Sequence, residues 1–196
     1  GGVIAAKLAE AGQRVVVLEA GGYFDEEDFD QIELHAYRNI FWRGGPTPTA
    51  DMNLTVQAGA CLGGGTTVNW TNCLRTRPWV RQEWVQEYGL EGVDGPEFDR
   101  HLDVVSTRMS VNDKCSDFNG PNQRLQDAAT RLGWAFSRLA RNTDQASYSP
   151  DTAGYLGFGD PTGSKQGTMK TYLQDAFDAG TEIFVHTAAE QILVDE

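Results

Sequence analysis

Two glycine-rich stretches carry the residues of this sequence that are best suited to hold a phosphate-bearing ligand. Residues 57–70 read QAGACLGGGTTVNW and contain Gly59, Gly63, Gly64, Gly65, Thr66 and Asn69. Glycine lets a backbone pass close to a ligand or take positive φ. Successive N–H groups and nearby hydroxyls then offer donors to phosphate oxygens. We therefore expect these six residues to contact a phosphate or the cofactor that bears it.

The opening residues, GGVIAAKLAEAGQRVVVLEAGG, predict a helix, a turn and a strand. Val3, Ile4 and Leu8 place apolar side chains on one helical face beside several alanines. Gly12 is expected to end the helix in the left-handed conformation. The apolar run 15–18 is typical of a strand buried on both faces. The pattern predicts the second half of a dinucleotide-binding βαβ unit, within an α/β fold with a Rossmann-like parallel sheet.

In such a unit, Gly1 and Gly2 would lie at the helix N-terminus, where backbone N–H groups bind a pyrophosphate. Glu19 would accept hydrogen bonds from ribose hydroxyls at the end of the strand. The strand and glycines that should precede Gly1 are not in the sequence. We therefore expect a fragment cut inside the glycine turn, with the first strand of its sheet missing. An ordinary helix and strand followed by a chance glutamate is the alternative interpretation.

Composition and cysteine content limit the choice of partners. The chain has 28 acidic and 16 basic residues, a net charge of −12, so nucleic acid and anionic membrane surfaces are poor partners. No apolar run approaches the length of a transmembrane segment. Cys61, Cys73 and Cys115 fit neither a disulfide framework nor a metal site. A metal-free, reduced, cytoplasmic protein that acts on a small molecule is expected, and the oligomeric state is not predicted.

The two glycine stretches, in this order, resemble the N-terminal part of the glucose–methanol–choline (GMC) oxidoreductases, which are FAD-dependent enzymes that oxidise alcohols. The residues that match the family's first signature are Gly59, Leu62, Gly63, Gly64, Gly65, Thr66, Val68 and Asn69. Ala60 departs from it. The GGGTTVNW stretch and residues 163–194 are similar to the long-chain fatty alcohol oxidase branch. Residues 154–160 lack the cysteines that are usual in that branch.

The resemblance implies that the chain binds FAD and belongs to an enzyme that moves a hydride from an alcohol to flavin. The similarity to one branch favours long-chain alcohols as the substrate. The position matching Ala189 touches the adenine through its backbone in this family. The family's catalytic base is a histidine near the C-terminus, which we expect beyond Glu196. No catalytic residue is therefore expected in this chain, and the fragment alone is expected to be inactive. His35, His101 and His186 are interpreted as structural or solvated.

Three segments of different character organise the chain. Residues 1–79 are assigned to the FAD-binding domain, residues 80–160 to a helical and loop insertion that contributes to the substrate domain, and residues 161–196 to a return into the FAD-binding domain. Within the first segment, residues 23–56 are expected to form a long irregular connection. In the last, a helix over 168–179, with Phe177 on its apolar face, should be followed by two strands in 181–187 and 188–194.

Three helices are predicted in the insertion. The first follows Pro78 and packs a stripe of Val80, Trp84 and Tyr88 into a core. A second begins at Pro96. The third covers 121–132 and ends at Gly133, and its inward residues are Leu125, Ala129 and Leu132.

Two other functions stay open from the residues alone. One is a nicotinamide-dependent Rossmann dehydrogenase, which has no need of a second glycine loop. The other is a non-catalytic, flavin-binding remnant of an enzyme.

Overall fold

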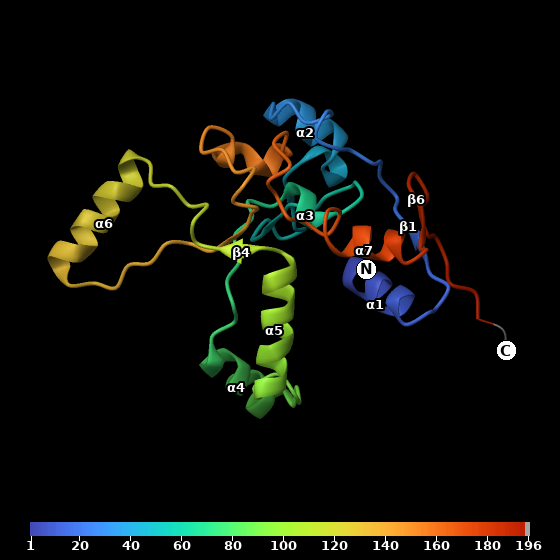
Figure 1. Cartoon of the computed structure of the whole chain (residues 1–196), viewed down its shortest axis with the longest axis horizontal. Helices are drawn as coiled ribbons and strands as arrows, with labels where there is room; N and C mark the ends of the chain where they lie inside the picture. Colours follow the sequence, from blue (N-terminus) through green and yellow to red (C-terminus); the bar gives the residue numbers. More distant parts are fainter. Residues whose placement is uncertain (195–196) are drawn as a thin grey trace. The chain divides into compact units, whose positions relative to one another are not determined.

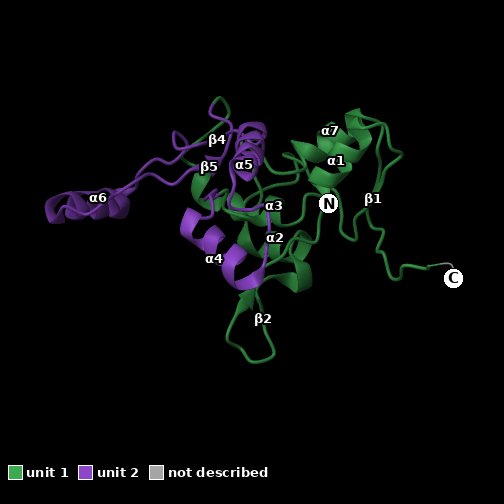
Figure 2. Ribbon diagram, turned by 90° about the horizontal axis from the view of Figure 1, so that it is seen from below, with its two compact units in different colours: residues 1–71, 146–196 green, residues 72–145 purple. Residues whose placement is uncertain are grey.

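The computed structural model describes residues 1–194, which form two compact units. Unit 1 contains residues 1–71 and the chain from Ala146 onward, and unit 2 contains Asn72–Gln145 (Figure 2). Both mix helices with short strands, so the fold is a mixed α/β structure with small sheets. All the residues predicted to hold the cofactor fall in unit 1.

The helices of unit 1 are α1 (Gly2–Glu10), α2 (Glu33–Asn39), α3 (Gly65–Val68) and α7 (Tyr172–Asp178), with 3₁₀ turns at η1 (Trp42–Gly44) and η2 (Ala153–Phe158). Its strands are β1 (Val16–Leu18), β2 (Thr47–Pro48), β3 (Thr55–Val56) and β6 (Glu182–Phe184). β1 and β6 pair in parallel, and β2 and β3 pair antiparallel. α1 and α7 come from the first and last parts of this unit in sequence, and they lie side by side (Figure 1).

Helix α1 ends as the sequence predicts. Gly12 takes a φ of +80°, and its N–H donates to Ala9 O at 2.8 Å. The N–H of Gln13 donates to Leu8 O at 3.0 Å, which completes a Schellman motif. A left-handed glycine is therefore the stop signal of this helix, because two carbonyls of its last turn receive partners there.

The packed face of α1 is not the predicted one. Its buried residues are Ala5, Ala6 and Ala9, whereas Val3, Ile4 and Leu8 are exposed. Leu173 and Ala176 of the neighbouring α7 are buried. The expectation of one apolar face thus identified the wrong side, because the alanines allow the close approach of α7 and larger side chains would hold it away.

Strand β1 also departs from its prediction. Val16 and Leu18 are 57% and 51% exposed, so the strand is not buried on both faces. Within the described residues, β1 pairs with β6 alone, in a register that joins Val17 to Ile183. The second predicted strand of the tail is not formed, because residues 188–194 have no regular structure.

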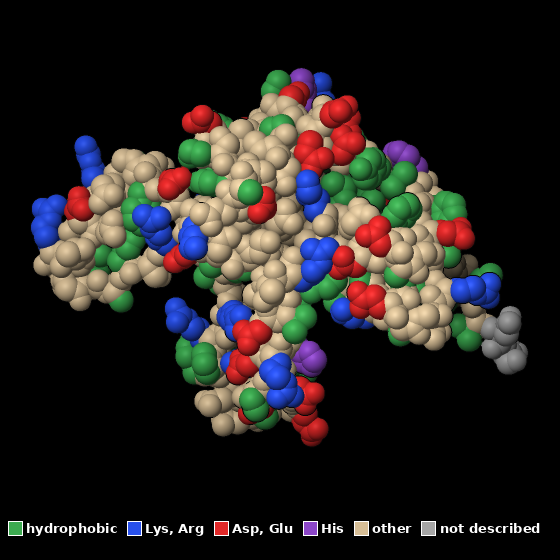
Figure 3. Space-filling view, viewed as in Figure 1, with side chains coloured by type: hydrophobic (Ala, Val, Ile, Leu, Met, Phe, Trp, Pro, Cys, Tyr) green, Lys and Arg blue, Asp and Glu red, His purple; other side chains and the backbone are tan. Residues whose placement is uncertain are grey.

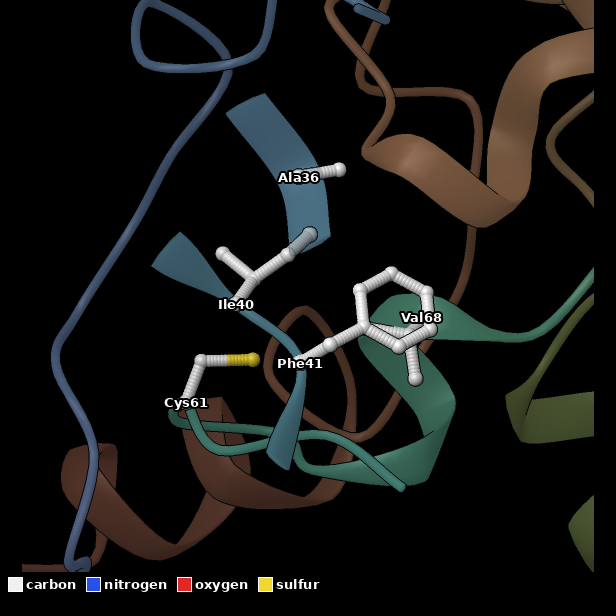
Figure 4. Close-up of a cluster of buried hydrophobic side chains, with 5 residues drawn as sticks. All are labelled: Ala36, Ile40, Phe41, Cys61 and Val68. Atoms are coloured by element: carbon white, nitrogen blue, oxygen red, sulfur yellow. The ribbon is translucent and has the colours of Figure 1, made fainter. Parts of the chain in front are cut away.

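The segment predicted to be a long irregular connection contains α2, η1 and the β2–β3 hairpin. It also supplies most of a buried cluster, which consists of Ala36, Ile40, Phe41, Cys61 and Val68 (Figure 4). The prediction of an irregular connection was therefore wrong, since few apolar residues were enough for α2 to pack beside the glycine-rich segment.

Unit 2 contains α4 (Pro78–Tyr88), α5 (Pro96–Arg108), α6 (Gly120–Leu132), β4 (Val111–Asn112) and β5 (Arg141–Asn142). All three predicted helices are present. Pro78 and Pro96 begin α4 and α5. The N–H that proline lacks has no cost there, because the first N–H groups of a helix have no partner within it. Gly89 and Gly133 follow α4 and α6 in the left-handed conformation, with φ of 65° and 68°.

The buried faces of these helices are thinner than predicted. Tyr88 is exposed, while Val80 and Trp84 are half-buried, and Arg81 is the buried residue of α4. Only Ala129 of α6 is buried. Leu125 and Leu132 are exposed, as is Phe177 at the end of α7. The predicted inward positions of Leu125 and Leu132 were wrong, because helical periodicity identifies an apolar face but not whether another element covers it.

The surface is mixed in charge. Figure 3 shows acidic and basic side chains interspersed over one face of the molecule, without an extended basic patch on that face. Among residues 1–194, no helix has the length and apolar content needed to cross a membrane.

Candidate cofactor site

The N-terminus of α1 offers backbone donors. This helix has nine residues, and no side chain caps its first turn. Its first N–H groups have no partner within the helix, which makes such a terminus suited to an anion. A Cβ on Gly1 would meet nothing within 4 Å, so this residue borders open space. On Gly2 it would lie 3.2 Å from Leu173 Cγ and 3.4 Å from Thr168 Cβ, so this glycine instead packs against the protein.

Glu19 follows β1, and both its backbone N–H and its carbonyl form hydrogen bonds. Its N–H donates to Phe184 O at 2.9 Å, and its carbonyl accepts from Thr187 N at 2.8 Å. The carboxylate Oε1 accepts from Gly21 N at 2.8 Å. One carboxylate oxygen therefore closes the turn after β1. The side chain lies at the end of the strand, as predicted, and is fixed in orientation by its own turn.

The glycines of the loop fall into two groups. A Cβ on Gly59 would lie 2.4 Å from Gly64 O, and one on Gly63 would lie 2.5 Å from Thr67 Oγ1. Gly64 and Gly65 have nothing within 4 Å of that position. Gly59 and Gly63 are thus needed for close packing within the protein. Gly64 and Gly65 border open space, where a ligand can approach the backbone.

Thr66 and Thr168 join the two predicted halves of the site. Thr66 Oγ1 donates to Gly63 O at 2.7 Å and accepts from Thr168 N at 2.9 Å. The two threonine hydroxyls are also 2.9 Å apart. Because Thr168 also lies beside Gly2, 3.4 Å from the position that a Cβ there would take, the start of α1 and the 63–66 turn both adjoin this residue. Sequence reasoning missed Thr168, and its only signal was a Gly-Thr pair in the tail.

Asn69 and Ala189 differ in how firmly they are held. Asn69 Oδ1 accepts from Thr71 N at 3.1 Å, and its carbonyl accepts from Lys165 Nζ at 2.6 Å. Ala189 is exposed and lies outside any helix or strand. The structure therefore brings Gly2, Gly63 and Thr66 together and anchors Asn69, while Ala189 has no comparable anchor.

Lys165 is the second residue that sequence reasoning missed. It is 6% exposed, and its ammonium donates to three backbone carbonyls, including that of Asn69. Burial lowers the pKa of this ammonium to about 7, against the opposing effect of Asp160. Burial likewise raises the pKa of the Cys61 thiol to about 11, so this cysteine is a packing residue and not a reactive thiol.

A cleft of about 530 Å³ lies in unit 1 beside these segments. Its lining includes Leu62, Met169, Leu173, Ile183 and Val185. Leu173 is the residue packed against Gly2, and Met169 lies 3.3 Å from the Cβ position of Gly63. The volume is within the range of small-molecule sites, and the wall is mainly apolar. An apolar cleft therefore adjoins both glycine segments.

The histidines lie in three different segments. His35 lies on α2, where its Nδ1 is 2.5 Å from Asp30 Oδ2, and both side chains are about half exposed. His101 lies on α5 and is exposed. His186 follows β6 and is exposed, and its N–H donates at 2.8 Å to Gly21 O, in the turn after Glu19. No cluster of His, Cys, Asp and Glu that could hold a metal occurs in the described part of the chain.

Comparison with known proteins identifies the class. The model of the GMC oxidoreductase family matches residues 37–196, so the chain belongs to this family, whose members bind FAD. Long-chain-alcohol oxidase FAO4B of Arabidopsis thaliana is 36% identical over 196 residues, which are 100% of this chain and 26% of the relative. Long-chain-alcohol oxidase FAO3 of the same plant is 34% identical over the same coverage.

A bacterial relative gives a similar match. The uncharacterised GMC-type oxidoreductase Rv0492c of Mycobacterium tuberculosis (strain ATCC 25618 / H37Rv) is 31% identical over 198 residues, covering 98% of this chain and 30% of that protein. The chain spans about a quarter of the length of the plant relatives. The predicted family resemblance is confirmed, including the likeness to long-chain-alcohol oxidases.

Proposed function

We propose that this chain forms the FAD-binding part of an oxidoreductase that oxidises the CH–OH group of an alcohol, with long-chain primary alcohols as the favoured substrates. The observation that carries the proposal is the meeting of two glycine segments, about sixty residues apart, at Thr168. Membership of the GMC family and the likeness to long-chain-alcohol oxidases support it. The parallel pairing of β1 and β6 is the arrangement that a Rossmann-like sheet requires.

The residues of the chain would bind and orient the cofactor. The free N–H groups of the first turn of α1, at Gly1 and Gly2, would hold the pyrophosphate. Glu19 would accept hydrogen bonds from the adenosine ribose with the carboxylate oxygen that does not close its own turn. Gly64 and Gly65, which border open space, would admit the ligand to the backbone at the start of α3.

The remaining site residues have supporting roles. Gly59, Gly63 and Thr66 would hold the loop in shape, Asn69 would line its flavin side, and the backbone of Ala189 would contact the adenine. Bound FAD would supply the acceptor for the hydride that leaves the alcohol carbon. No proton-transfer role is assigned to a histidine of this chain, because His35 bonds to Asp30, His101 is exposed on α5, and His186 bonds to the turn of Glu19, on the side proposed for the ribose.

The test is the visible absorption spectrum of the product of the full coding sequence, before and after anaerobic addition of a long-chain primary alcohol. A flavin spectrum that bleaches with the alcohol supports both the cofactor and the reaction. A flavin spectrum unchanged by a panel of alcohols would favour a non-catalytic flavin-binding protein. Purified, folded protein that contains nicotinamide cofactor or no cofactor would contradict the proposal.

A further inference from the structure

Lys165 makes an unusual set of contacts for a buried charge. Its Nζ donates to Thr67 O, to Asn69 O at 2.6 Å and to Leu156 O at 2.9 Å. All three acceptors are backbone carbonyls, and the side chain is almost fully buried. A buried ammonium is tolerated only where its donors are satisfied. The three N–H bonds of the charged amine are all used here, so this geometry matches the protonated form.

Two of the acceptors lie at the C-terminal end of α3. A helix leaves its last carbonyls without partners, and a cation at that end is favourable. α3 has only four residues, too few to be stable by itself. By binding the carbonyls of Thr67 and Asn69, Lys165 therefore fixes the end of a helix that cannot fix itself.

The residues after Lys165 hold the other end of α3. Thr168 bonds to Thr66 Oγ1, and its hydroxyl lies 3.3 Å from Gly63 O. A Cβ on Gly167 would lie 2.9 Å from Thr66 O, so the intervening backbone also approaches α3 closely. Residues 165–168 thus contact both ends of the helix.

Asp160 positions this segment. Its Oδ2 accepts from Lys165 N at 2.6 Å and from Ser164 Oγ at 2.9 Å, while its Oδ1 accepts from the hydroxyl of Thr162 at 2.7 Å. These bonds close the turn that delivers the lysine side chain to α3. Lys165 is therefore held at its backbone by one buried carboxylate and at its tip by three carbonyls.

From this geometry we infer that Lys165 is a positioning residue for FAD: its ammonium clamps the end of α3 and thereby holds the glycine loop in its cofactor-binding shape. The inference rests on the proposed function, since it assigns Lys165 a role in the same cofactor loop. It adds a residue outside both glycine stretches and without contact to the cofactor itself. Its effect passes through the backbone of residues 67–69.

The clamp depends on the protonation of Lys165. A neutral amine has two N–H donors for the three carbonyls, so one contact is lost when the proton leaves. Burial lowers the pKa of Lys165 to about 7, and Asp160 opposes this fall. The Cys61 thiol beside it stays neutral in this range, because burial raises its pKa to about 11. Glu26 and Lys170, which line the small cavity beside Lys165, form an ion pair with each other. The number of clamping bonds therefore changes near neutral pH.

The experiment measures the dissociation constant of FAD for apoprotein made from the full coding sequence, between about pH 6 and pH 8.5. The variant Lys165→Met keeps the apolar stem and removes the donors. Lys7→Met, at an exposed lysine of α1 in the same unit, is the matched control. The thermal midpoint of each apoprotein is measured in parallel.

Wild type and Lys7→Met are expected to bind FAD more weakly as pH rises through this range. Lys165→Met should bind at least about tenfold more weakly at the acidic end and lose the pH dependence. Unchanged affinity in Lys165→Met, or a lower thermal midpoint with the wild-type FAD profile, would overturn the inference and leave the proposed function intact. If Lys165→Met does not fold, a flat wild-type profile overturns it and a falling one supports it. Wild-type protein that binds no FAD contradicts both the inference about Lys165 and the proposed function.

Discussion

The two compact units differ in how far apart in sequence their main contacts lie. In unit 1, Thr66 bonds to Thr168, Lys165 bonds to Thr67, and Trp70 Nε1 donates to Gly154 O at 3.1 Å. Each of these contacts joins residues more than eighty positions apart. The candidate cofactor loop is therefore shaped by a segment that the chain reaches only much later.

Unit 2 depends more on local signals. Prolines begin α4 and α5, and left-handed glycines follow α4 and α6. Arg81 of α4 forms an ion pair with Asp99 of α5 at 2.9 Å. The difference teaches that a substitution in the loop of unit 1 disturbs several distant segments at once, whereas most substitutions in unit 2 act on one helix.

The largest expected effect tests the close packing in unit 1. A Cβ on Gly21 would lie 1.9 Å from Ala60 O, and the backbone there cannot move as a side chain can. We expect Gly21→Ala to lower the free energy of unfolding by about 3 kcal/mol, as measured by urea unfolding. Gly120→Ala, where a Cβ meets nothing within 4 Å, is the control and should change it by less than about 0.5 kcal/mol. Equal losses of stability in Gly21→Ala and Gly120→Ala would contradict the contrast drawn between the two units.

A smaller effect tests Arg81, whose contact between α4 and α5 is an exception to the local signals of unit 2. Arg81 is buried, and its Nη1 bonds to Asp99 and, at 3.1 Å, to Val93 O. We expect Arg81→Met to lower the free energy of unfolding by about 2 kcal/mol, because the variant leaves these partners without their donor. The control is Arg100→Met, which removes an exposed ion pair of 3.9 Å with Glu97 and should cost less than about 0.5 kcal/mol. A loss no larger than that of the control would mean that Arg81 does not link α4 and α5.

The smallest effect, taken per pH unit, is the dependence of stability on pH in unit 1. The pKa of Lys165 is about 7 in the folded protein, below the ordinary value of 10.5. Between these values the unfolded chain holds a proton that the folded protein has released, so stability should rise with pH, by at most about 1.4 kcal/mol per unit. The window from pH 7 to pH 9 is suitable, because the raised pKa of Cys61 acts in the opposite direction at higher pH.

In Lys165→Met this slope should disappear, and unfolding followed at several pH values gives the measurement. The sign is opposite to that expected for FAD affinity, since one equilibrium compares folded with unfolded protein and the other compares bound with free cofactor. An identical slope in wild type and Lys165→Met would assign the pH dependence to other groups.

The local features of this protein were determined by its sequence. Gly12, Pro96 and Gly133 mark helix ends in the structure as they do in the sequence, because caps depend on the conformational limits of single residues. The glycine loop was also recognisable, and the family through it, because the residues of the loop occupy consecutive positions. The roles of Glu19 and of the loop residues toward FAD stay predictions that the binding experiments test.

Only the tertiary structure decided which faces and which distant residues meet. The alanines of α1, and not Val3, Ile4 and Leu8, face α7, because the available space, rather than apolar content, selects the packed side. Lys165 carries no local sign of a role and Thr168 only that of a Gly-Thr pair, since a lysine and a threonine are ordinary surface residues until a fold buries them. Lys165 bonds to the carbonyls of Thr67 and Asn69, and Thr168 bonds to the hydroxyl of Thr66, in each case about a hundred residues earlier, and no local pattern records such pairings.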